Sequence, residues 1–224
     1  MRKRSEVINK AILDVAKDLF ITKGYDSTTI DQIAKNAGIT KKTIYAHYPD
    51  KDTILKSAIK DLVNSSLERD LIDDFNIESR DDLYKELYII AKSLNDTFAQ
   101  DSYIRLLRIV ISEINNHVGL NSISSVGIVS YSMKKLTTIF ESTNKSGLTS
   151  MKNINNGSKM FIGGFLVQFY IDGLLEPSPN KYIKCTSAEL FDYVDKFTKV
   201  LFRPKPNLKD DILSVAYKGN SYGV

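Results

Sequence analysis

The chain has 224 residues, of which 42% are hydrophobic, so it can form a full core as one large domain or as two modest ones. Its single cysteine, Cys185, excludes an intramolecular disulfide framework and favours a reducing compartment, so we expect a cytoplasmic protein. The net charge is +4, but residues 1–60 carry 12 basic and 7 acidic side chains while residues 61–224 carry 19 and 20, so the positive excess lies entirely at the amino end.

That charge asymmetry is typical of a DNA-binding head joined to a sensing or oligomerising body, although solvated lysine-rich faces are also common. A membrane protein is not expected. The most apolar run, Met160–Ile171, is well short of the about 20 residues that a spanning helix needs. Arg2-Lys3-Arg4 resembles the start of a signal peptide, but Glu6, Lys10 and Asp14 follow it in an amphipathic pattern.

The first predicted elements are a basic arm over residues 1–4 and a helix over residues 5–23. The helix has one apolar stripe, formed by Ile8, Ala11, Ile12, Val15, Ala16, Leu19 and Phe20, and Gly24 follows its end. We expect this helix to pack against the two helices that follow it. The arm is a candidate for an additional contact to phosphate or to the minor groove.

Residues 28–51 predict two short helices joined by a tight turn. Ile30, Ile33, Ala34 and Ala37 recur at helical spacing, and Gly38 supplies the left-handed backbone that ends the first helix. A second helix can begin after Thr40, a plausible N-cap, and end before Pro49. A helix, a turn of three or four residues that contains glycine, and a second helix form the helix-turn-helix unit.

The second of these helices is too polar to be wholly core, and it is the predicted recognition helix. Thr40, Lys41, Lys42 and Thr43 lie at its amino end, which is the end that reaches base edges in this motif. Thr28 and Thr29, at the start of the first helix, are expected to offer hydroxyl and backbone N–H groups to phosphate. Tyr48 is favoured as a core aromatic residue.

Residues 4–55 resemble, without gaps, the DNA-binding domain of the TetR family of bacterial transcriptional regulators. The resemblance rests on Ile12, Ala16, Leu19, Phe20, Gly24-Tyr25, Thr28-Thr29, Ile33-Ala34, Ala37-Gly38-Ile39, Thr43-Ile44-Tyr45, His47-Tyr48, Lys51 and Leu55. It covers about a quarter of the chain. It implies backbone contacts from Tyr45 and His47 and a phosphate contact from Lys51, for which an ordinary surface lysine is the alternative. Lys42 departs from the family, which more often has a small residue there.

The rest of the chain predicts an all-α fold. A fourth helix over residues 51–70 would connect the head to the body, and residues 73–76 and 78–82 interrupt the apolar pattern as a linker or loop. Helices are expected over residues 83–98, 106–114, 123–140, 160–175 and 190–201, with a loop over 143–157 and a short helix within 208–217. We therefore divide the chain into a DNA-binding domain over residues 1–50 and a helical effector-binding and dimerisation domain over 51–224.

The segment over residues 160–175 is apolar nearly all round, and Gly163 and Gly164 within it are typical of a close approach between helices. In the TetR family the last two long helices form a four-helix dimer interface. The resemblance therefore implies a homodimer, and two heads are needed to read two half-sites. An ordinary monomer core is the alternative.

The sequence does not favour an enzyme, because it has no metal-spaced Cys/His set, no P-loop, no dinucleotide fingerprint and no glycine-flanked nucleophile. No cofactor and no metal site are expected. A pocket for a small molecule is the more plausible role of the body. The candidate lining residues are Tyr84, Tyr88, Tyr103, Arg108, His117, Met133, Phe161, Phe165 and Gln168, although plain core is favoured over a pocket for each of them.

Together these patterns predict a homodimeric transcriptional regulator, most simply a repressor, that binds a palindromic operator in double-stranded DNA. Residues 107–113 faintly resemble a stretch common in AcrR-like members of the family, many of which answer to apolar compounds. The expected inducer is therefore a small apolar molecule of unknown identity. The alternative is a DNA-binding protein without an inducer, whose carboxyl-terminal domain only dimerises or binds a protein partner.

Overall fold

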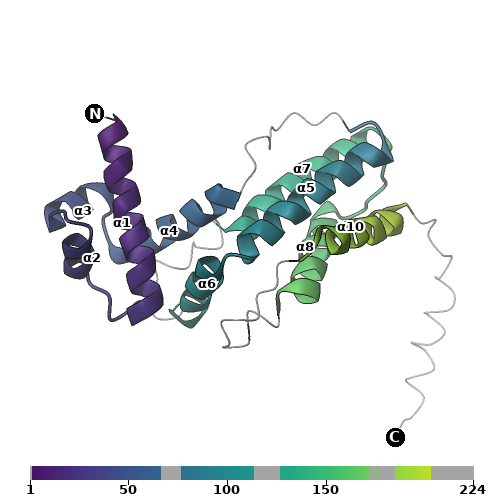
Figure 1. Cartoon of the computed structure of the whole chain (residues 1–224). Coiled ribbons are helices and arrows are strands. Elements are labelled where there is room, and N and C mark those ends of the chain that lie inside the picture. The colour runs from purple at the N-terminus through teal and green to yellow at the C-terminus, as the bar shows by residue number, and fades with distance from the viewer. Residues whose placement is uncertain (1, 67–76, 114–126, 172–174, 176–184, 203–224) are drawn as a thin grey trace, which may run out of the picture.

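The computed structural model describes residues 2–66, 77–113, 127–171, 175 and 185–202, and the regular structure of these residues is helical (Figure 1). The all-α prediction is confirmed. In chain order the helices are α1 (Arg2–Lys23), α2 (Ile30–Asn36), α3 (Lys41–His47), α4 (Lys51–Ser66), α5 (Arg80–Phe98), α6 (Asp101–Glu113), α7 (Ile128–Lys145), α8 (Ile154–Phe169) and α10 (Ser187–Leu201). Figure 1 shows α1, α2 and α3 grouped at one end, with α5 to α10 forming the body at the other.

The head is built around the apolar stripe of α1. Ile12, Ala16 and Phe20 are fully buried, and α1 packs against α2 and α4. Tyr25 follows the left-handed Gly24, with φ of 85°, and its ring packs on Phe20 with centroids 5.3 Å apart. The predicted basic arm is wrong for residues 2–4, which form the first turn of α1 because nothing in Arg2-Lys3-Arg4 opposes a helix.

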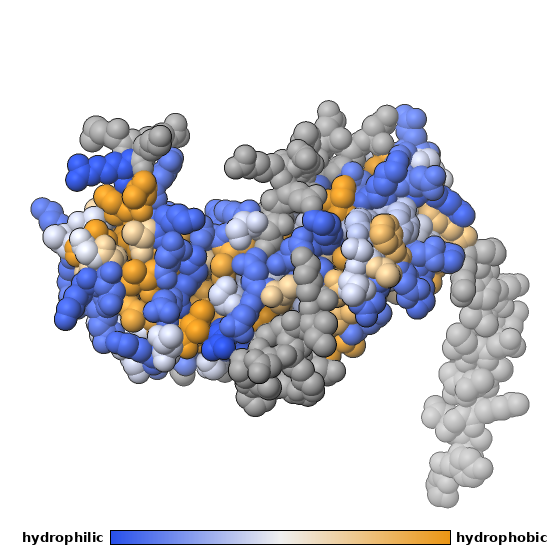
Figure 2. All heavy atoms as spheres, in the orientation of Figure 1, coloured by the Kyte–Doolittle hydropathy of each residue, from blue (hydrophilic) through white to orange (hydrophobic). Residues whose placement is uncertain are grey.

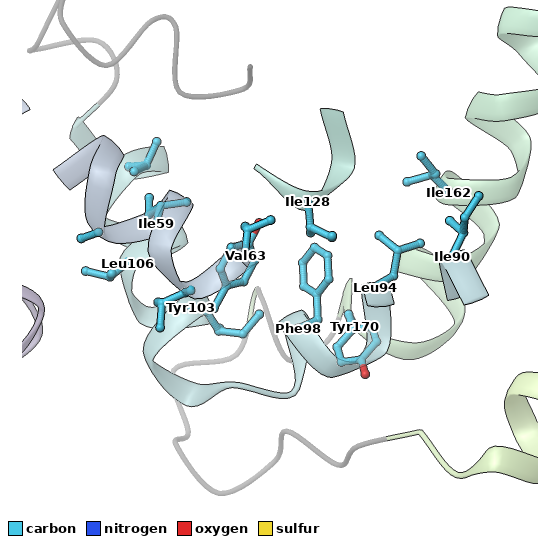
Figure 3. Packing of buried hydrophobic residues seen from close by; sticks show 14 of the residues in the cluster. Ile59, Val63, Ile90, Leu94, Phe98, Tyr103, Leu106, Ile128, Ile162 and Tyr170 are labelled. Carbon is cyan, nitrogen blue, oxygen red and sulfur yellow. The ribbon is translucent and has the colours of Figure 1, made fainter. Parts of the chain in front are cut away.

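Helix α4 joins the head to the body, as its two-sided packing shows. It contacts α1 on the head side and both α5 and α6 on the body side. Figure 3 shows Ile59 and Val63 of α4 within the same buried cluster as Tyr103 and Leu106 of α6. The hydrophobic core therefore continues from the head into the body. The predicted extension of this helix to residue 70 lies outside the described residues.

The body stacks long helices face to face. Helix α7 packs on α5 and α8, and α10 packs on α5. Aromatic rings fill the space between α8 and α10, where Phe161 lies 4.9 Å from Phe197 and 5.4 Å from Tyr193, measured between ring centroids. The Tyr193 hydroxyl donates to the Phe161 carbonyl and lies 3.1 Å from the position that a Cβ at Gly164 would take. The close contact at Gly164 is therefore made by a tyrosine side chain, and the expected close approach between helices remains a prediction.

A buried amide fixes the start of α10 to the middle of the body. Asn95 of α5 is 1% exposed, and its Nδ2 donates to the carbonyl of Cys185 at 3.1 Å while its Oδ1 accepts the Cys185 N–H at 3.0 Å. The Tyr170 hydroxyl donates to the same Oδ1. Cys185 is itself buried, and burial raises the pKa of its thiol to about 12, which agrees with a packing role for this cysteine.

Several predicted boundaries are wrong. Helix α5 begins at Arg80, inside the expected linker, because Ser79 and Asp82 form a capping box there. Helix α7 continues to Lys145 and α8 begins at Ile154, so the expected loop over 143–157 is shortened at both ends. Gly147, with φ of 77°, follows the end of α7, and Asn153 caps α8. The expected helix start over 123–126 and the helix within 208–217 lie outside the described residues.

Candidate nucleic-acid interface

Helix α2 is held by caps at both of its ends. The Thr29 hydroxyl accepts the Gln32 N–H at 3.2 Å, and the Gln32 side chain accepts the Thr29 N–H at 3.1 Å, which completes a capping box. Gly38, with φ of 66°, turns the chain, and the Ile39 N–H donates back to the Ala34 carbonyl at 3.0 Å. The predicted glycine turn is confirmed, and it sets α3 directly after α2.

Helix α3 has one buried anchor and a polar outer face. Ile44 is fully buried in the head, while Lys41, Lys42 and Tyr45 are exposed, Tyr45 at 49%. Thr40 is the N-cap, as predicted, and its hydroxyl accepts the Thr43 N–H at 3.1 Å. The two threonine hydroxyls also lie 2.8 Å apart. The side chains predicted for the recognition helix are therefore displayed together at its amino end, and Figure 2 shows that the surface of α2 and α3 is mostly hydrophilic.

The two tyrosines of this region have opposite environments. Tyr48 is 6% exposed and its hydroxyl donates to Oδ1 of Asn9 on α1, so its predicted core placement is confirmed. Burial raises its pKa. Tyr45, one turn earlier, points outward, and His47 is half-buried with its ring 6.4 Å from that of Tyr48. Tyr45 is thus the more accessible of the predicted backbone contacts.

Thr28 requires a correction. Its side chain is 1% exposed, and its hydroxyl donates to the carbonyls of Gly24 at 2.8 Å and Leu19 at 3.2 Å. Its backbone N–H donates to the Tyr25 carbonyl at 3.1 Å. The expectation that this residue offers free donors to phosphate is therefore wrong in this structure, because both donors serve the turn after α1. Thr29 is exposed.

Lys51, at the start of α4, is part of the head's internal bonding. Its ammonium donates to the carbonyls of Tyr25 at 2.7 Å and Thr28 at 3.1 Å and lies 4.1 Å from the centre of the Tyr25 ring. Burial lowers its pKa. The Tyr25 hydroxyl in turn donates to Asp52, the next residue of α4. Lys51 thus links the start of α4 to the turn before α2 by hydrogen bonds. Its expected contact to phosphate remains a prediction.

Of the described residues predicted to line a ligand pocket, Phe161 and Phe165 lie together against the Tyr193 ring, but the set as a whole is spread over several places in the body. Tyr84 and Tyr88 stack on Phe191 at the surface, with ring centroids 6.3 Å and 4.4 Å from it. Phe161, Phe165 and Tyr103 are buried core, Met133 and Arg108 are half-buried, and Gln168 is exposed. His117 lies outside the described residues.

A pocket of about 130 Å³ lies elsewhere in the body, between α5, α6, α7 and the end of α8. It is lined by Phe98, Leu107, Val129, Leu166, Tyr170 and Ile171. None of these was among the predicted ligand residues. Each is an apolar or aromatic residue in a helix or directly after one, so its sequence signal is that of ordinary core, and nothing in one sequence distinguishes a pocket wall from a packed neighbour.

The described ranges contain neither a candidate metal site nor a candidate membrane span. No group of three or more His, Cys, Asp or Glu side chains there is arranged to hold a metal ion. None of the helices resolved in those ranges is both long and apolar enough to cross a membrane.

Residues 12–58 match the family described as bacterial regulatory proteins, tetR family. The chain carries a TetR-family DNA-binding domain. This matched segment runs from the buried stripe of α1 through α2 and α3 into α4, so it contains every residue proposed above for DNA contact except those of the arm over residues 1–4. The resemblance inferred from the motif is confirmed.

The curated relatives agree. The chain is 31% identical over 110 residues to the biofilm operon icaADBC negative transcriptional regulator IcaR of Staphylococcus epidermidis, which covers 48% of this chain and 59% of that protein. It is 45% identical over 49 residues to IcaR of Staphylococcus aureus, which covers 22% of this chain and 26% of that protein. The chain thus spans less than two thirds of the length of these TetR-type regulators.

Solved structures share the fold over most of the chain. The flavonoid-responsive regulator FrrA superposes with a TM-score of 0.66 at 21% identity, covering 89% of this chain and 98% of that one. NalD, the secondary repressor of the MexAB-OprM multidrug efflux pump in Pseudomonas aeruginosa, superposes with a TM-score of 0.59 at 19% identity, covering 90% and 100%. These likenesses establish the TetR fold for the described helices of the body as well as the head.

Proposed function

We propose that the protein is a homodimeric transcriptional repressor that binds a palindromic operator. The observation that carries the proposal is the construction of α3, in which buried Ile44 fixes a short helix whose Lys41, Lys42 and Tyr45 point outward. In a helix-turn-helix dimer two such helices enter successive major grooves about 34 to 36 Å apart. Repression is supported by the name of IcaR, a negative transcriptional regulator.

Selection of bound fragments from random duplex DNA, followed by fluorescence anisotropy on the recovered site, tests this function. We expect an inverted repeat, and we expect Thr43→Ala to relax base preference because Thr43 lies at the groove-facing end of α3. Lys51→Gln should weaken binding to all sequences and flatten the salt dependence if its ammonium reaches phosphate. Recovery of sequences without a common motif would overturn the proposal.

Dimerisation is supported by an exposed apolar face on α8. Met160 and Val167 are 62% and 66% exposed, and Gly163 and Gly164 lie between them on the same side of the helix. A Cβ at Gly163 would meet no atom of the chain within 4 Å. Large exposed apolar side chains around a small residue suit a close crossing with a second copy.

Gly163→Glu is a sharp test because the single chain has room for the new side chain. We expect sedimentation to show a monomer whose circular dichroism matches that of the wild type. Asn64→Glu, which adds the same charge at an exposed position of α4, should leave the dimer intact. If Gly163→Glu is still a dimer, α8 is not part of the dimer interface.

We further propose that a small apolar molecule in the pocket between α5 and α8 releases the DNA. The pocket is similar in volume to engineered cavities of about 150 Å³ that bind benzene, so a neutral compound with a single ring or a short chain suits it. Leu107, which lines the pocket, is a residue of α6, and α6 packs against α1 and α4 of the head. Such a ligand can shift the DNA-binding equilibrium only as far as its affinities for the two states differ.

Thermal unfolding with a panel of single-ring and short-chain compounds tests this site. A ligand should raise the melting temperature of the wild type and lower its affinity for the operator, and Val129→Phe should abolish both effects by filling the pocket. A dimer that binds its operator but is stabilised by none of these compounds favours the alternative, a regulator without an inducer.

A further inference from the structure

An ion pair joins the two helices of the helix-turn-helix on its exposed side. Nζ of Lys41, the first residue of α3, lies 3.1 Å from Oδ2 of Asp31, the second residue of α2. The two side chains are 49% and 70% exposed. Lys42 is exposed beside it, but among the residues that the structure describes no carboxylate pairs with it. The two adjacent lysines of the recognition helix therefore present different charges to an approaching duplex.

This ion pair contributes little to folding, because exposed pairs are screened by solvent and hold two mobile side chains in one geometry. The pair does act on the Lys41 ammonium. Asp31 raises the pKa of Lys41 through its hydrogen bond and its charge. We therefore expect the Asp31–Lys41 pair to affect DNA binding more than folding.

We propose that Asp31 is a specificity-determining residue that acts through Lys41. Phosphates attract a lysine by charge, whatever the sequence, whereas base edges are distinguished by the positions of their hydrogen-bond acceptors. The Asp31 carboxylate cancels most of the charge that would draw Lys41 to a phosphate. It engages one of three ammonium donors and leaves the others for acceptors such as guanine O6 and N7.

This inference rests on the proposed function and assigns a role within that same interface. Asp31 is a positioning residue, since it restrains Lys41 and need not touch DNA. Lys42, without a carboxylate beside it in the described head, supplies the sequence-independent attraction instead. The operator preference should therefore depend on the Asp31–Lys41 pair, and total affinity should depend more on Lys42.

The test measures dissociation constants of the full-length protein for its selected operator and for a scrambled duplex over a series of salt concentrations. In Asp31→Asn we expect the scrambled duplex to bind more tightly, with a log–log salt slope steeper by about 0.9, the value for one added phosphate contact. The ratio of the two dissociation constants should fall by on the order of tenfold, which is the loss of one good base contact. Asp31→Glu, which keeps the carboxylate, should retain the wild-type ratio.

Background variants show whether the effect passes through Lys41. In a Lys41→Gln background, Asp31→Asn should leave the ratio unchanged, whereas in a Lys42→Gln background it should lower the ratio as in the wild type. The proposal is overturned if Asp31→Asn tightens binding to both duplexes equally, or if its effect on the ratio survives in Lys41→Gln. Asp31→Ser gives a second neutral variant should Asp31→Asn fold poorly.

The result separates this inference from the proposed function. A wild-type protein that shows no preference between the two duplexes contradicts the regulator itself. A wild-type protein with a clear preference that Asp31→Asn preserves contradicts only the role of Asp31.

Discussion

The head and the body of this protein are stabilised in different ways. Helices α2 and α3 have 7 residues each, which is too short to be stable alone, and they depend on polar caps at their ends and on one or two buried anchors. Helices α5 and α7 have 19 and 18 residues and bury continuous apolar faces against one another. The capped helices α2 and α3 can display polar side chains on their outer faces for recognition, whereas the body relies on packed rings and one buried amide.

The largest effect that this comparison predicts is in the aromatic packing of the body. Phe161 is fully buried between Tyr193 and Phe197 of α10. Phe161→Ala should lower the free energy of unfolding by about 3 to 5 kcal/mol, because it removes a ring and leaves a cavity. Urea denaturation followed by circular dichroism measures the change. Tyr45→Ala, which truncates an exposed ring of the head, should change it by less than about 0.5 kcal/mol.

The buried amide of Asn95 should be the next most sensitive point. Asn95→Ala leaves the Cys185 N–H and carbonyl without their partner and removes one of the acceptors of the Tyr170 hydroxyl, which keeps the backbone carbonyl of residue 95 at 3.3 Å. We expect a loss of about 2 to 4 kcal/mol, because each buried polar group left unpaired costs about 1 to 3 kcal/mol. Burial holds the pKa of the Cys185 thiol near 12 in the wild type, so the same variant should also make the thiol react faster with a disulfide reagent at pH 8. An unreactive thiol together with unchanged stability would contradict this role for the amide.

The head could be predicted from the sequence nearly residue by residue, because its signals are local. One short stretch of sequence is enough to predict a glycine with positive φ, or a threonine that caps a helix and pairs with a residue three positions later. The interior of the body could not be predicted in this way. Phe165 and Phe98 have the same kind of apolar spacing, but one is packed core and the other lines the pocket. The difference depends on how residues distant in sequence meet.

The two adjacent threonines of the head show where local signals fail. The sequence predicts a phosphate contact for both Thr28 and Thr29, because both lie at the predicted start of α2. The structure turns Thr28 inward. We expect Thr28→Val to cost about 1 to 2 kcal/mol of unfolding free energy, since it removes the donor to two carbonyls while keeping the volume. Thr29→Val should cost about 1 kcal/mol through loss of the cap.

The DNA affinities of Thr28→Val and Thr29→Val test whether Thr28 lies outside the DNA interface. The DNA affinity should be unchanged in Thr28→Val, because the buried hydroxyl does not reach phosphate. Anisotropy titrations measure the affinity under conditions where both variants are folded. A weaker affinity in Thr28→Val than in the wild type would restore this residue to the interface.

The smallest predicted effect is a difference in acid response between head and body. The capping box of α2 uses the neutral Gln32, whereas those of α5 and α10 use Asp82 and Glu189. Hydrogen bonds from the Thr186 N–H and hydroxyl lower the pKa of Glu189, and the Ser79 hydroxyl does the same for Asp82. A lowered pKa means that the folded state favours the charged form.

The sign of the pH dependence follows from that preference. The stabilisation by Glu189 is present in full above the pKa of an unfolded glutamate, about 4.3, and is lost as the pH falls through the lower pKa of the folded state. Glu189→Gln should therefore be slightly less stable than the wild type at pH 6, and the difference should vanish near pH 3. Urea denaturation at both pH values measures this. Gln32→Glu makes the cap of α2 ionisable and should give α2 the same acid sensitivity. If the stability difference between Glu189→Gln and the wild type instead grows as the pH falls, the role assigned to the charged cap is contradicted.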